Sequence, residues 1–436
     1  MTLLGAVEGY YGPPLQHEAR LDMVRWLATR GYDTFLYAPK SDPYHRDRWR
    51  EPYPPDRAAQ LRALVEEGRA CGVEVCLVIS PGLDWRPGDE AVLVAKLRSF
   101  TALGARSLGV AWDDVPPGGA DLGAAHGRAV AAAAGQISAA RWFTCPTDYA
   151  TAAATPYLRA FAAELPAAVE VMWTGPSVVS PVVPVEQARA LRESLGRRPL
   201  FAENFPVNDG TIAGVLHLGP YPRRDAALRD EVSGAVMNVM RLPLASRLGL
   251  AVAARFWRQG SGDRERDWRE CVAEVPGLAP LARACRAWVG DAGADPELLD
   301  WTRRAIATRG ADTRLREFLE RGCRGQLDER LAAEVAPWID QWEDEAAAML
   351  AALSLLAAAP EHRSEAAMLT ALLWARARSS AVQAFGIRHA YYPVTRRDSA
   401  GVLLPDPAGL ERHDNLTDLL CSAALGSGGN SGPSRD

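Results

Sequence analysis

Two adjacent carboxylates, Asp113 and Asp114, directly follow the apolar run SLGVAW, which begins at Ser107. An apolar run of this kind predicts a buried strand, so both acids would emerge together from a protein core. Two carboxylates side by side repel each other, and partial loss of water raises the pKa of at least one of them. A neutral carboxylic acid beside an ionised carboxylate is the pair that acid–base cleavage of a glycosidic bond requires.

The same two residues are compatible with other roles. Asp is a common N-cap of helices and a common member of surface ion pairs, so the pair could be purely structural. Paired Asp residues also bind divalent cations such as Mg²⁺. We favour acid–base chemistry because the polar residues at the other predicted strand ends include Asn, Tyr, Thr and Lys. These residue types recognise hydroxyl groups better than they enclose a metal ion.

Seven further apolar runs resemble the one before Asp113, and amphipathic helical patterns separate most of them. The eight runs span residues 3–11, 34–39, 73–81, 107–115, 141–147, 169–173, 199–204 and 234–239. Repeated strand–helix units predict parallel pairing, and near-continuous apolar strands predict a sheet that is covered on both faces. Eight such units in about 250 residues have the size of a (β/α)8 TIM barrel, so we predict an α/β fold of this type.

The carboxyl ends of the strands in such a barrel meet at one mouth, where barrel enzymes have their active sites. Polar or aromatic residues follow nearly every predicted strand, among them Tyr10, Tyr11, Lys40, Asp113, Asp114, Tyr149, Trp173, Thr174, Asn204, Asp209 and Asn238. We expect the aromatic rings to form walls for the apolar faces of a sugar, and the amides and acids to bind its hydroxyls. Lys40 is unusual because only two of the 49 basic residues are Lys. A compact ammonium fits where a guanidinium does not.

The pattern changes to helices after residue 260. We divide the chain into a barrel at 1–260, a connecting segment at 261–294, an α-helical bundle at 295–392 and a loop-like tail at 393–436 that is disordered at its end. A long loop with little regular structure is expected at 207–231. Apolar residues such as Trp338, Trp342 and Met349 recur at helical spacing in the bundle. The bundle would pack on the barrel or on a second subunit, which predicts a homodimer through the helical domain.

Composition excludes several classes of protein. The formal net charge of −5 leaves no basic excess for a nucleic acid. No run reaches the roughly 18 apolar residues of a membrane helix, and the first residues do not resemble a signal peptide. The seven cysteines are scattered and form no CxxC pair, which argues against a zinc or redox site. We therefore expect no metal, no cofactor, no nucleic-acid or membrane partner, and a cytoplasmic location.

The residues at these strand ends resemble glycoside hydrolase family 84, the β-N-acetylglucosaminidases that include the O-GlcNAcases and that are sometimes described as hyaluronidases. The resemblance covers residues 3–258. It rests on blocks that occur in the family's order, including GAVEGYYGPP, LYAPKSDPYHRDRWREPYP, AWDDV, CPTDY, VMWTGPSVVS and ENFPVNDG. The helical region fits the layout of the family only loosely.

The resemblance implies a retaining, substrate-assisted mechanism in which the 2-acetamido oxygen attacks the anomeric carbon and forms an oxazoline. Asp113 would orient and deprotonate the acetamido N–H, and Asp114 would protonate the leaving oxygen and then activate water. Tyr149 would hydrogen-bond the acetamido oxygen. Further substrate-binding residues implied by the family are Gly9, Lys40, Thr174, Val178, Asn204, Asp209 and Asn238, of which Thr174 and Val178 line the acetamido side. The family implies no metal and no other cofactor.

The sequence departs from the family pattern before Asn204. The family usually has Trp-Asp-Asn where this chain has Ala202, Glu203 and Asn204. An Ala leaves about 100 Å³ of additional room at the acetamido group, unless Phe201 or Phe205 fills it. The leading interpretation is a cytoplasmic β-N-acetylhexosaminidase that removes terminal β-linked N-acetylglucosamine. The alternatives are an enzyme for a related N-acylated amino-sugar metabolite and a sugar-binding protein without turnover.

Overall fold

The computed structural model describes residues 3–288, 293–323, 327–391, 395–397, 403–405, 410–412 and 415–426. The chain forms two compact units. The first, here called the barrel unit, comprises Met1–Gly210, Tyr221–Arg264 and Pro393–Gly409. The second, the helical unit, comprises Thr211–Pro220, Glu265–Tyr392 and Leu410–Asp436.

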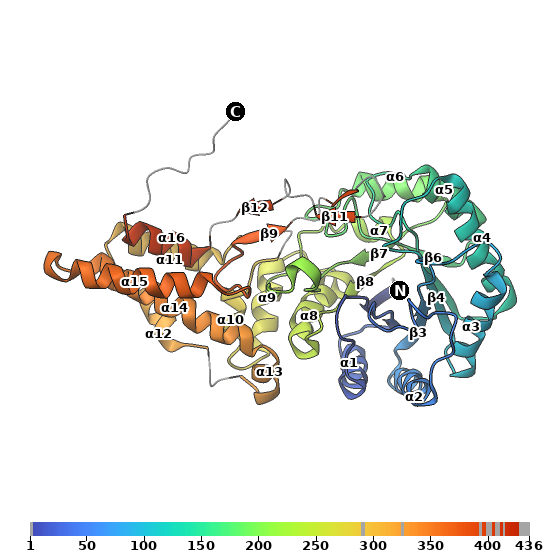
Figure 1. The fold of residues 1–436 in the computed structure, drawn as a ribbon, viewed down its shortest axis with the longest axis horizontal. Coiled ribbons are helices and arrows are strands. Elements are labelled where there is room, and N and C mark those ends of the chain that lie inside the picture. The colour runs from blue at the N-terminus through green and yellow to red at the C-terminus, as the bar shows by residue number, and fades with distance from the viewer. Residues whose placement is uncertain are drawn as a thin grey trace. The chain divides into compact units, whose positions relative to one another are not determined.

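Eight parallel strands form a closed barrel, which confirms the predicted (β/α)8 fold (Figure 1). They are β1 (Leu3–Glu8), β2 (Thr34–Tyr37), β3 (Glu74–Ile79), β4 (Ser107–Ala111), β5 (Arg141–Cys145), β6 (Val169–Trp173), β7 (Leu200–Glu203) and β8 (Gly234–Asn238). The strands follow one another in chain order, and β8 closes the barrel against β1. Gly5 lies in this seam, where a Cβ atom would come within 2.6 Å of Val236.

The interior of the barrel is filled by apolar side chains from alternate positions of the strands, as expected for this fold. The fully enclosed members include Leu36, Cys76, Phe143 and Leu200. Four members of the same cluster are only partly buried: Val7, Cys145, Met172 and Ala202. Each of these four lies at or next to the carboxyl end of its strand. They therefore form the floor of the barrel mouth.

Helices connect the strands and cover the outside of the barrel (Figure 1). They are α1 (His17–Thr29), α2 (Pro55–Cys71), α3 (Glu90–Ala102), α4 (Ala120–Gln136), α5 (Pro156–Glu164), α6 (Val185–Leu195), α7 (Leu228–Glu231) and α8 (Pro243–Gln259). Thr155 caps α5 by accepting a hydrogen bond from the backbone N–H of Leu158. The expected long loop at 207–231 contains a single 3₁₀ turn (Gly210–Ile212) and α7.

Part of that loop belongs to the helical unit. Residues Thr211–Pro220 join it through backbone contacts that span long stretches of chain. The Leu218 N–H donates to the Cys285 carbonyl at 3.0 Å, and Val215 bridges Gln383. This middle part of the loop therefore belongs to the helical unit, which its irregular sequence pattern did not indicate.

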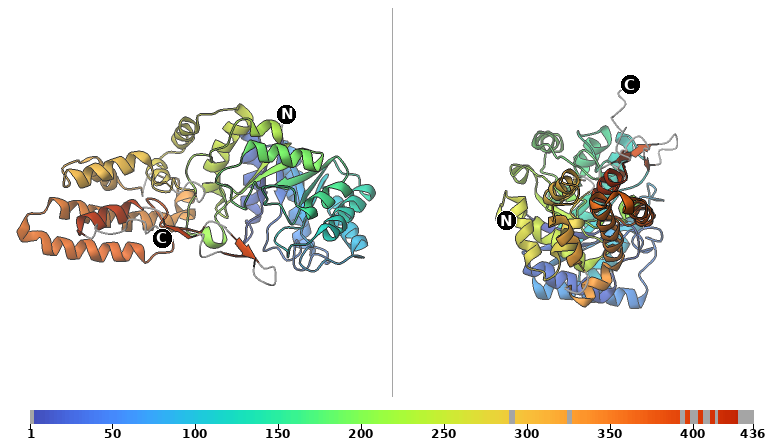
Figure 2. Two further views of the ribbon diagram at one scale, coloured as in Figure 1. Left: turned by 90° about the horizontal axis from the view of Figure 1, so that it is seen from above. Right: turned by 90° about the vertical axis from the view of Figure 1, so that its left-hand side faces the viewer.

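The helical unit is built from α9 to α16. Its helices are α9 (Arg264–Ala273), α10 (Ala279–Ala284), α11 (Pro296–Ala307), α12 (Arg314–Arg321), α13 (Glu329–Glu334), α14 (Ala336–Ala357), α15 (Arg363–Arg378) and α16 (Leu416–Ala424). Helix α14 packs along α15 and α16 (Figure 2). The segment 261–294, expected as a connection, holds α9 and α10. No helix in the described ranges is long and apolar enough to cross a membrane.

The tail differs from the expected loop. Asn415 caps α16 by accepting hydrogen bonds from the N–H groups of Thr417 and Asp418, and Leu416 and Leu420 are buried. Two short antiparallel pairs precede this helix: β10 (Thr395–Arg397) with β11 (Leu403–Pro405), and β9 (His389–Tyr391) with β12 (Leu410–Arg412). The sequence predicts disorder at the end of the tail, residues 426–436, and all of these except Gly426 lie outside the described residues.

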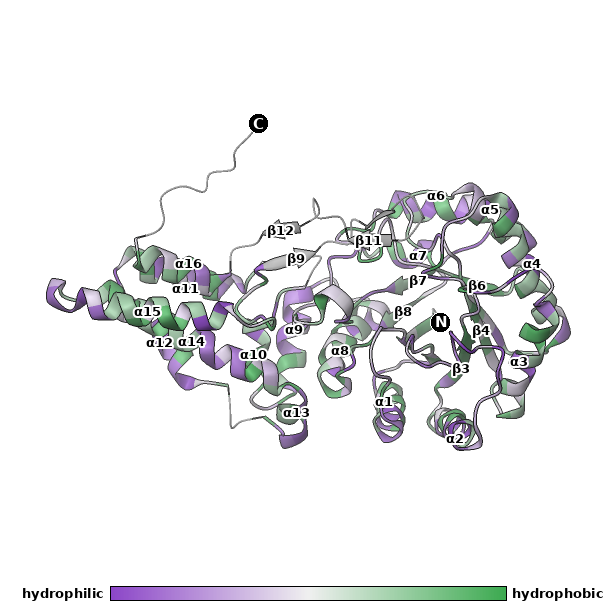
Figure 3. Ribbon diagram, in the orientation of Figure 1, coloured by the Kyte–Doolittle hydropathy of each residue, from purple (hydrophilic) through white to green (hydrophobic). Residues whose placement is uncertain are grey.

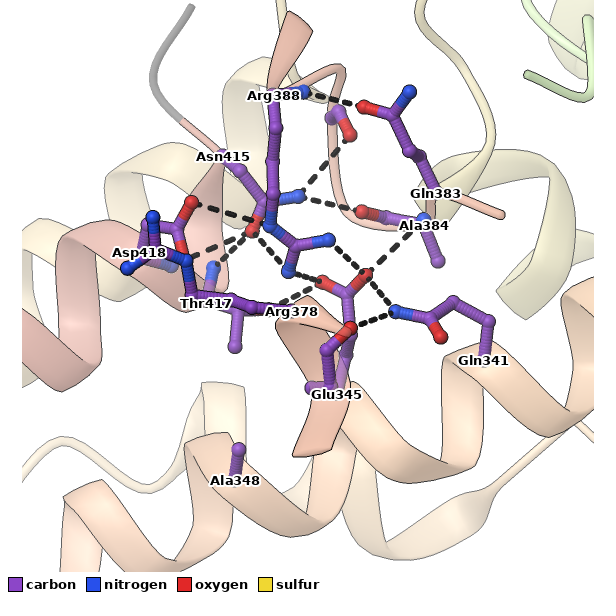
Figure 4. Close-up of polar contacts among 12 residues, drawn as sticks. Gln341, Glu345, Ala348, Arg378, Gln383, Ala384, Arg388, Asn415, Thr417 and Asp418 are labelled. Carbon is purple, nitrogen blue, oxygen red and sulfur yellow. Dashed lines mark hydrogen bonds and ion pairs between the residues drawn. The ribbon is translucent and has the colours of Figure 1, made fainter. Parts of the chain in front are cut away.

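A buried polar network fixes α16 to α14 (Figure 4). The Glu345 carboxylate pairs with Arg388 at 3.0 Å and accepts hydrogen bonds from Thr417 and Gln341 at 2.6 and 2.7 Å. Burial raises the pKa of Glu345, and the Arg388 charge opposes that rise. Because each oxygen has donors, the network explains how a charged pair is accommodated inside the helical unit.

Candidate active site

Lys40 and Asp113 form a buried ion pair at the barrel mouth. Lys40 follows β2, Asp113 follows β4, and the Lys40 Nζ donates to the Asp113 Oδ2. Burial raises the pKa of Asp113, but the Lys40 charge lowers it further, so the net pKa is below its usual value. Burial lowers the pKa of Lys40, yet the Asp113 charge raises it, and the net pKa is above its usual value. Both side chains are therefore charged near neutral pH.

The second oxygen of Asp113 has no hydrogen-bond partner among the described residues. The Asp113 Oδ1 is fully enclosed, although the side chain as a whole is 13% exposed. An ionised carboxylate oxygen that is buried without a donor is unfavourable. This oxygen is thus an acceptor without a donor, in a carboxylate whose side chain is partly exposed at the mouth.

Asp114 is held by two tyrosines. The Tyr11 hydroxyl donates to the Asp114 Oδ2 at 2.7 Å, and the Tyr149 hydroxyl donates to the Asp114 Oδ1 at 2.9 Å. Burial and the Asp114 charge raise the pKa of Tyr149 well above its ordinary value, so this hydroxyl remains a donor. Asp114 also has a left-handed backbone with a φ of 55°. Non-glycine residues adopt this conformation mainly where their surroundings impose it.

A chain of amides connects the ends of β1, β7 and β8. The Gly9 N–H donates to the Asn238 Oδ1 at 3.1 Å, and the Asn238 Nδ2 donates to the Asn204 Oδ1 at 3.0 Å. The Asn204 Nδ2 donates in turn to the Val178 carbonyl at 2.7 Å. These bonds fix the orientation of both Asn side chains at the mouth.

Asp209 and Thr174 complete the set of predicted residues. The Tyr11 N–H donates to the Asp209 Oδ2 at 2.6 Å, and burial raises the pKa of Asp209. The Thr174 hydroxyl donates to the Ser177 carbonyl at 2.8 Å, and the Thr174 N–H donates to the Tyr149 carbonyl at 3.0 Å. Thr174 therefore stabilises its own turn and the backbone of Tyr149. All ten predicted site residues lie at strand ends or in the loops that follow them.

Two residues predicted to form aromatic walls do not face the mouth. Tyr10 is 1% exposed and Trp173 is 2% exposed. The Tyr10 hydroxyl donates to the Pro13 carbonyl, and the Trp173 indole donates to the Thr151 carbonyl. The tyrosine that is accessible is Tyr11, at 47% exposure. The sequence predicted that both tyrosines form walls of the mouth, but it did not indicate which of the two side chains is accessible there.

Ala202 lies on the floor of the mouth. Its side chain belongs to the partly buried interior group that includes Cys145 and Met172. Neither neighbouring Phe occupies the space above it. Phe201 is fully buried against Trp173 and Trp257, with ring centroids 6.1 Å away in both cases, and Phe205 packs on Tyr221 at 5.6 Å.

The part of the chain that the structure describes contains no group of three or more His, Cys, Asp or Glu residues arranged to hold a metal ion. The paired acids, which could also have been a cation site, are held by protein donors instead. An ammonium contacts Asp113, and two hydroxyls contact Asp114. These contacts favour proton chemistry over cation binding.

Polar residues gathered at the carboxyl ends of eight parallel strands define the class of (β/α)8-barrel enzymes. Residues 4–288 match the family model described as beta-N-acetylglucosaminidase. The chain belongs to this family of enzymes, glycoside hydrolase family 84.

Comparison with known proteins supports the same family. The protein O-GlcNAcases of Rattus norvegicus and Mus musculus are each 34% identical to this chain over 257 residues. The alignment covers 54% of this chain but 28% of those relatives, so the chain corresponds to less than a third of their length.

Solved structures share the fold. A mutant O-GlcNAc hydrolase of Thermobaculum terrenum has a TM-score of 0.79 at 23% identity, covering 97% of this chain and 94% of that chain. The structure named CpGH84B has a TM-score of 0.78 at 23% identity, covering 88% of this chain and 74% of that chain. The likeness to the first structure extends over the helical unit as well as the barrel.

Proposed function

We propose that this protein is a retaining β-N-acetylhexosaminidase that releases terminal β-linked N-acetylglucosamine from a glycoconjugate by substrate-assisted catalysis. The observation that carries the proposal is the Asp113 carboxylate, which has one oxygen paired with Lys40 and the other buried without a donor. An acetamido N–H supplies the missing donor. Asp114 lies next to it in sequence, where an acid can reach the glycosidic oxygen of the same sugar.

In the first step, the acetamido oxygen attacks the anomeric carbon while the bond from that carbon to the leaving oxygen breaks. Asp113 accepts the hydrogen bond of the acetamido N–H and takes its proton as positive charge develops on the nitrogen. Asp114 donates a proton to the leaving oxygen. The products are an oxazoline and the free aglycone. The Tyr149 hydroxyl, whose one hydrogen is donated to the Asp114 Oδ1 in the structure, would turn to donate to the acetamido oxygen.

In the second step, Asp114 takes a proton from water, and the water oxygen attacks the anomeric carbon. The oxazoline ring opens, and Asp113 returns the proton to nitrogen. Two displacements at one carbon retain the β-configuration. Sugar hydroxyls would be bound by the groups that the amide chain and the ion pair hold in place: Gly9, Lys40, Asn204, Asp209 and Asn238. Thr174 and Val178 would line the acetamido side.

The proposal predicts that the purified protein hydrolyses aryl β-N-acetylglucosaminides with retention, which proton NMR of the first-formed sugar detects. Prolonged treatment with EDTA should leave the rate unchanged, because the acids are held by protein donors. Binding of N-acetylglucosamine without turnover would favour a sugar-binding protein. Loss of activity that Mg²⁺ or Zn²⁺ restores would contradict the mechanism.

Because Ala202 places only a small side chain on the floor of the mouth, we expect the enzyme to accept N-acyl groups longer than acetyl. Each methylene buried in unfilled space is worth about 0.8 kcal/mol, whereas overpacking costs about 1–3 kcal/mol. The ratio of kcat/KM for N-butyryl over N-acetyl substrates should therefore be at least about tenfold higher in the wild type than in Ala202→Trp. Phe201→Leu is the matched control, because that ring points away from the mouth. An unchanged ratio in Ala202→Trp would show that position 202 does not face the acyl group.

We further propose that the helical unit forms a homodimer through α15. Hydrophobic residues lie along much of α15 (Figure 3). Three of its large apolar residues, Met368, Leu369 and Leu372, are 68%, 52% and 64% exposed. Antiparallel packing on a second copy would cover them. It would also bring the acidic first turn of each α15 near the basic last turn of the other. Sedimentation of the wild type and of Leu369→Glu tests this, and a monomeric wild type contradicts it.

A further inference from the structure

Arg46 is a buried cation that the sequence did not indicate as part of the site. It lies in the loop between β2 and α2 and is 6% exposed. Among the described residues, no carboxylate lies within ion-pair distance of its guanidinium, and its Nη1 is enclosed without a hydrogen-bond partner. Arginine is rarely buried unless it is paired. Burial of this guanidinium without a counter-ion does not stabilise the fold, so the position of Arg46 needs another reason.

The guanidinium of Arg46 reaches the backbone of Asp114. Its Nη2 donates to the Asp114 carbonyl at 3.3 Å, and its central carbon lies 5.9 Å from the centroid of the Tyr11 ring. Tyr11 is one of the two donors to the Asp114 carboxylate. Arg46 thus contacts Asp114 through the carbonyl and through the tyrosine that holds the side chain.

This contact matters because Asp114 has the left-handed backbone noted above. The two tyrosine hydroxyls restrain its carboxylate, but they do not restrain the peptide that follows. The hydrogen bond from Arg46 restrains that peptide. A rotation there would move the carboxylate away from the Asp113 side of the mouth.

Arg46 is itself anchored to β3 through the preceding residue. The His45 Nδ1 bonds the Val78 carbonyl at 2.8 Å, and the Ser80 N–H donates to the His45 carbonyl at 2.8 Å. Burial and the Lys40 charge lower the pKa of His45 to about 3, so the imidazole is neutral at working pH. No additional charge from His45 therefore opposes the guanidinium.

We propose that Arg46 is a positioning residue that holds the Asp114 backbone in the conformation required for proton transfer to the leaving oxygen. This role rests on the proposed function. Arg46 bonds the Asp114 backbone directly and acts on Asp113 only through its charge, which helps to lower the pKa of that carboxyl after the larger effect of Lys40. Loss of Arg46 should therefore affect the steps that need acid assistance much more than those that need only Asp113. That selectivity separates positioning from a general structural role.

The test compares kcat of Arg46→Ala on two β-N-acetylglucosaminides, one with an acidic phenol and one with an alkyl alcohol as leaving group. A misplaced catalytic group costs up to about 10²-fold. We expect a loss of about 10- to 100-fold on the alkyl glycoside and less than about threefold on the aryl glycoside. Added methylguanidinium should restore the alkyl rate, and NaCl at the same concentration should not.

Arg48→Ala is the matched control, since Arg48 lies in the same loop, is about half exposed and pairs with Glu51. Both rates should equal those of the wild type. If Arg46→Ala does not fold, Arg46→Lys replaces it, because a single ammonium does not reproduce the planar fork. It should show the same selectivity to a smaller degree.

Equal losses on both substrates, an unchanged alkyl rate, or a loss that methylguanidinium does not restore would each overturn the role of Arg46. These results would leave the proposed function intact, because hydrolysis of the same two substrates by the wild type and its loss in an Asp114→Asn variant test that function separately. A wild type that hydrolyses neither glycoside would overturn the proposed function, and the role of Arg46 with it.

Discussion

In an Asp114→Asn variant, we expect kcat/KM for alkyl β-N-acetylglucosaminides to fall by about 10²–10⁴-fold, which is the usual contribution of general acid catalysis. The loss on a dinitrophenyl glycoside should be much smaller, because that phenol leaves without a proton. The geometry supports this selectivity. Tyr11 and Tyr149 can still hydrogen-bond an Asn at this position, so the variant loses the proton donor while its side chain stays in place.

Rates on a series of leaving groups measure this effect, and Asp84→Asn is the control. Asp84 lies in the loop after β3 and pairs with Arg50 at the surface, outside the hydrogen bonds around Asp114. Its replacement should change neither substrate. A loss in Asp114→Asn that does not depend on the leaving group would show that Asp114 is not the acid.

The barrel could be predicted from sequence because each strand has a local signature. Eight short apolar runs, separated by helical patterns, correspond one to one to β1 through β8. The runs extended two or more residues beyond most of the strands, since apolar character continues into the buried ends of the loops. The first run, for example, was expected to end at Tyr11, whereas β1 ends at Glu8.

The helical unit was less predictable because its assembly depends on distant contacts. Thr211–Pro220 joins it through Cys285 and Gln383, which are more than 60 positions away in the chain. Helix α16 needs the cap of Asn415 and the buried network around Glu345. A local pattern contains no information about such partners.

Some residues of the candidate site were likewise predictable from local sequence, and others were not. Asp113 and Asp114 were predictable because they are adjacent and follow a buried strand. Lys40 was noticeable because Lys is rare in this chain, and it proves to be the ion-pair partner of Asp113. Arg46 could not be distinguished from the many other arginines, because only the folded loop brings it to the Asp114 carbonyl. Tyr11 and Tyr10 differ only in the direction of their side chains, which depends on where β1 ends.

An Asp113→Asn variant should lose activity on every leaving group, by about 10²–10⁴-fold. An amide can accept the acetamido N–H bond, but it cannot take the proton or stabilise the positive charge that develops on nitrogen. This charge develops whether the aglycone is a phenol or an alcohol. Equal losses on the aryl and alkyl substrates would therefore distinguish Asp113 from Asp114, and a loss confined to alkyl glycosides would contradict the assigned role.

The same variant should be less stable in a way that depends on pH. Because the folded pKa of Asp113 is below its unfolded value of about 3.9, its ion pair stabilises the fold above that pH and is lost as the pH falls through the folded pKa. Lys40 has a raised pKa, so its contribution is lost only as the pH rises through that folded pKa, above about 10.4. The variant leaves Lys40 buried without a counter-ion, although the amide oxygen still accepts its hydrogen bond. We expect a loss of unfolding free energy of about 3 kcal/mol or less at pH 7.

Urea unfolding of the wild type and of Asp113→Asn at pH 7 and pH 3 measures this difference. The difference in unfolding free energy should be smaller at pH 3, because this pH is below the unfolded pKa of about 3.9, so the unfolded chain of the wild type binds a proton at Asp113 and the stabilisation by the ion pair declines. A variant that is inactive but shows the same difference at both pH values would mean that the Lys40–Asp113 ion pair does not stabilise the fold. In that case the buried pair would be maintained for catalysis alone, with Lys40 keeping Asp113 ionised and ready to accept the substrate N–H.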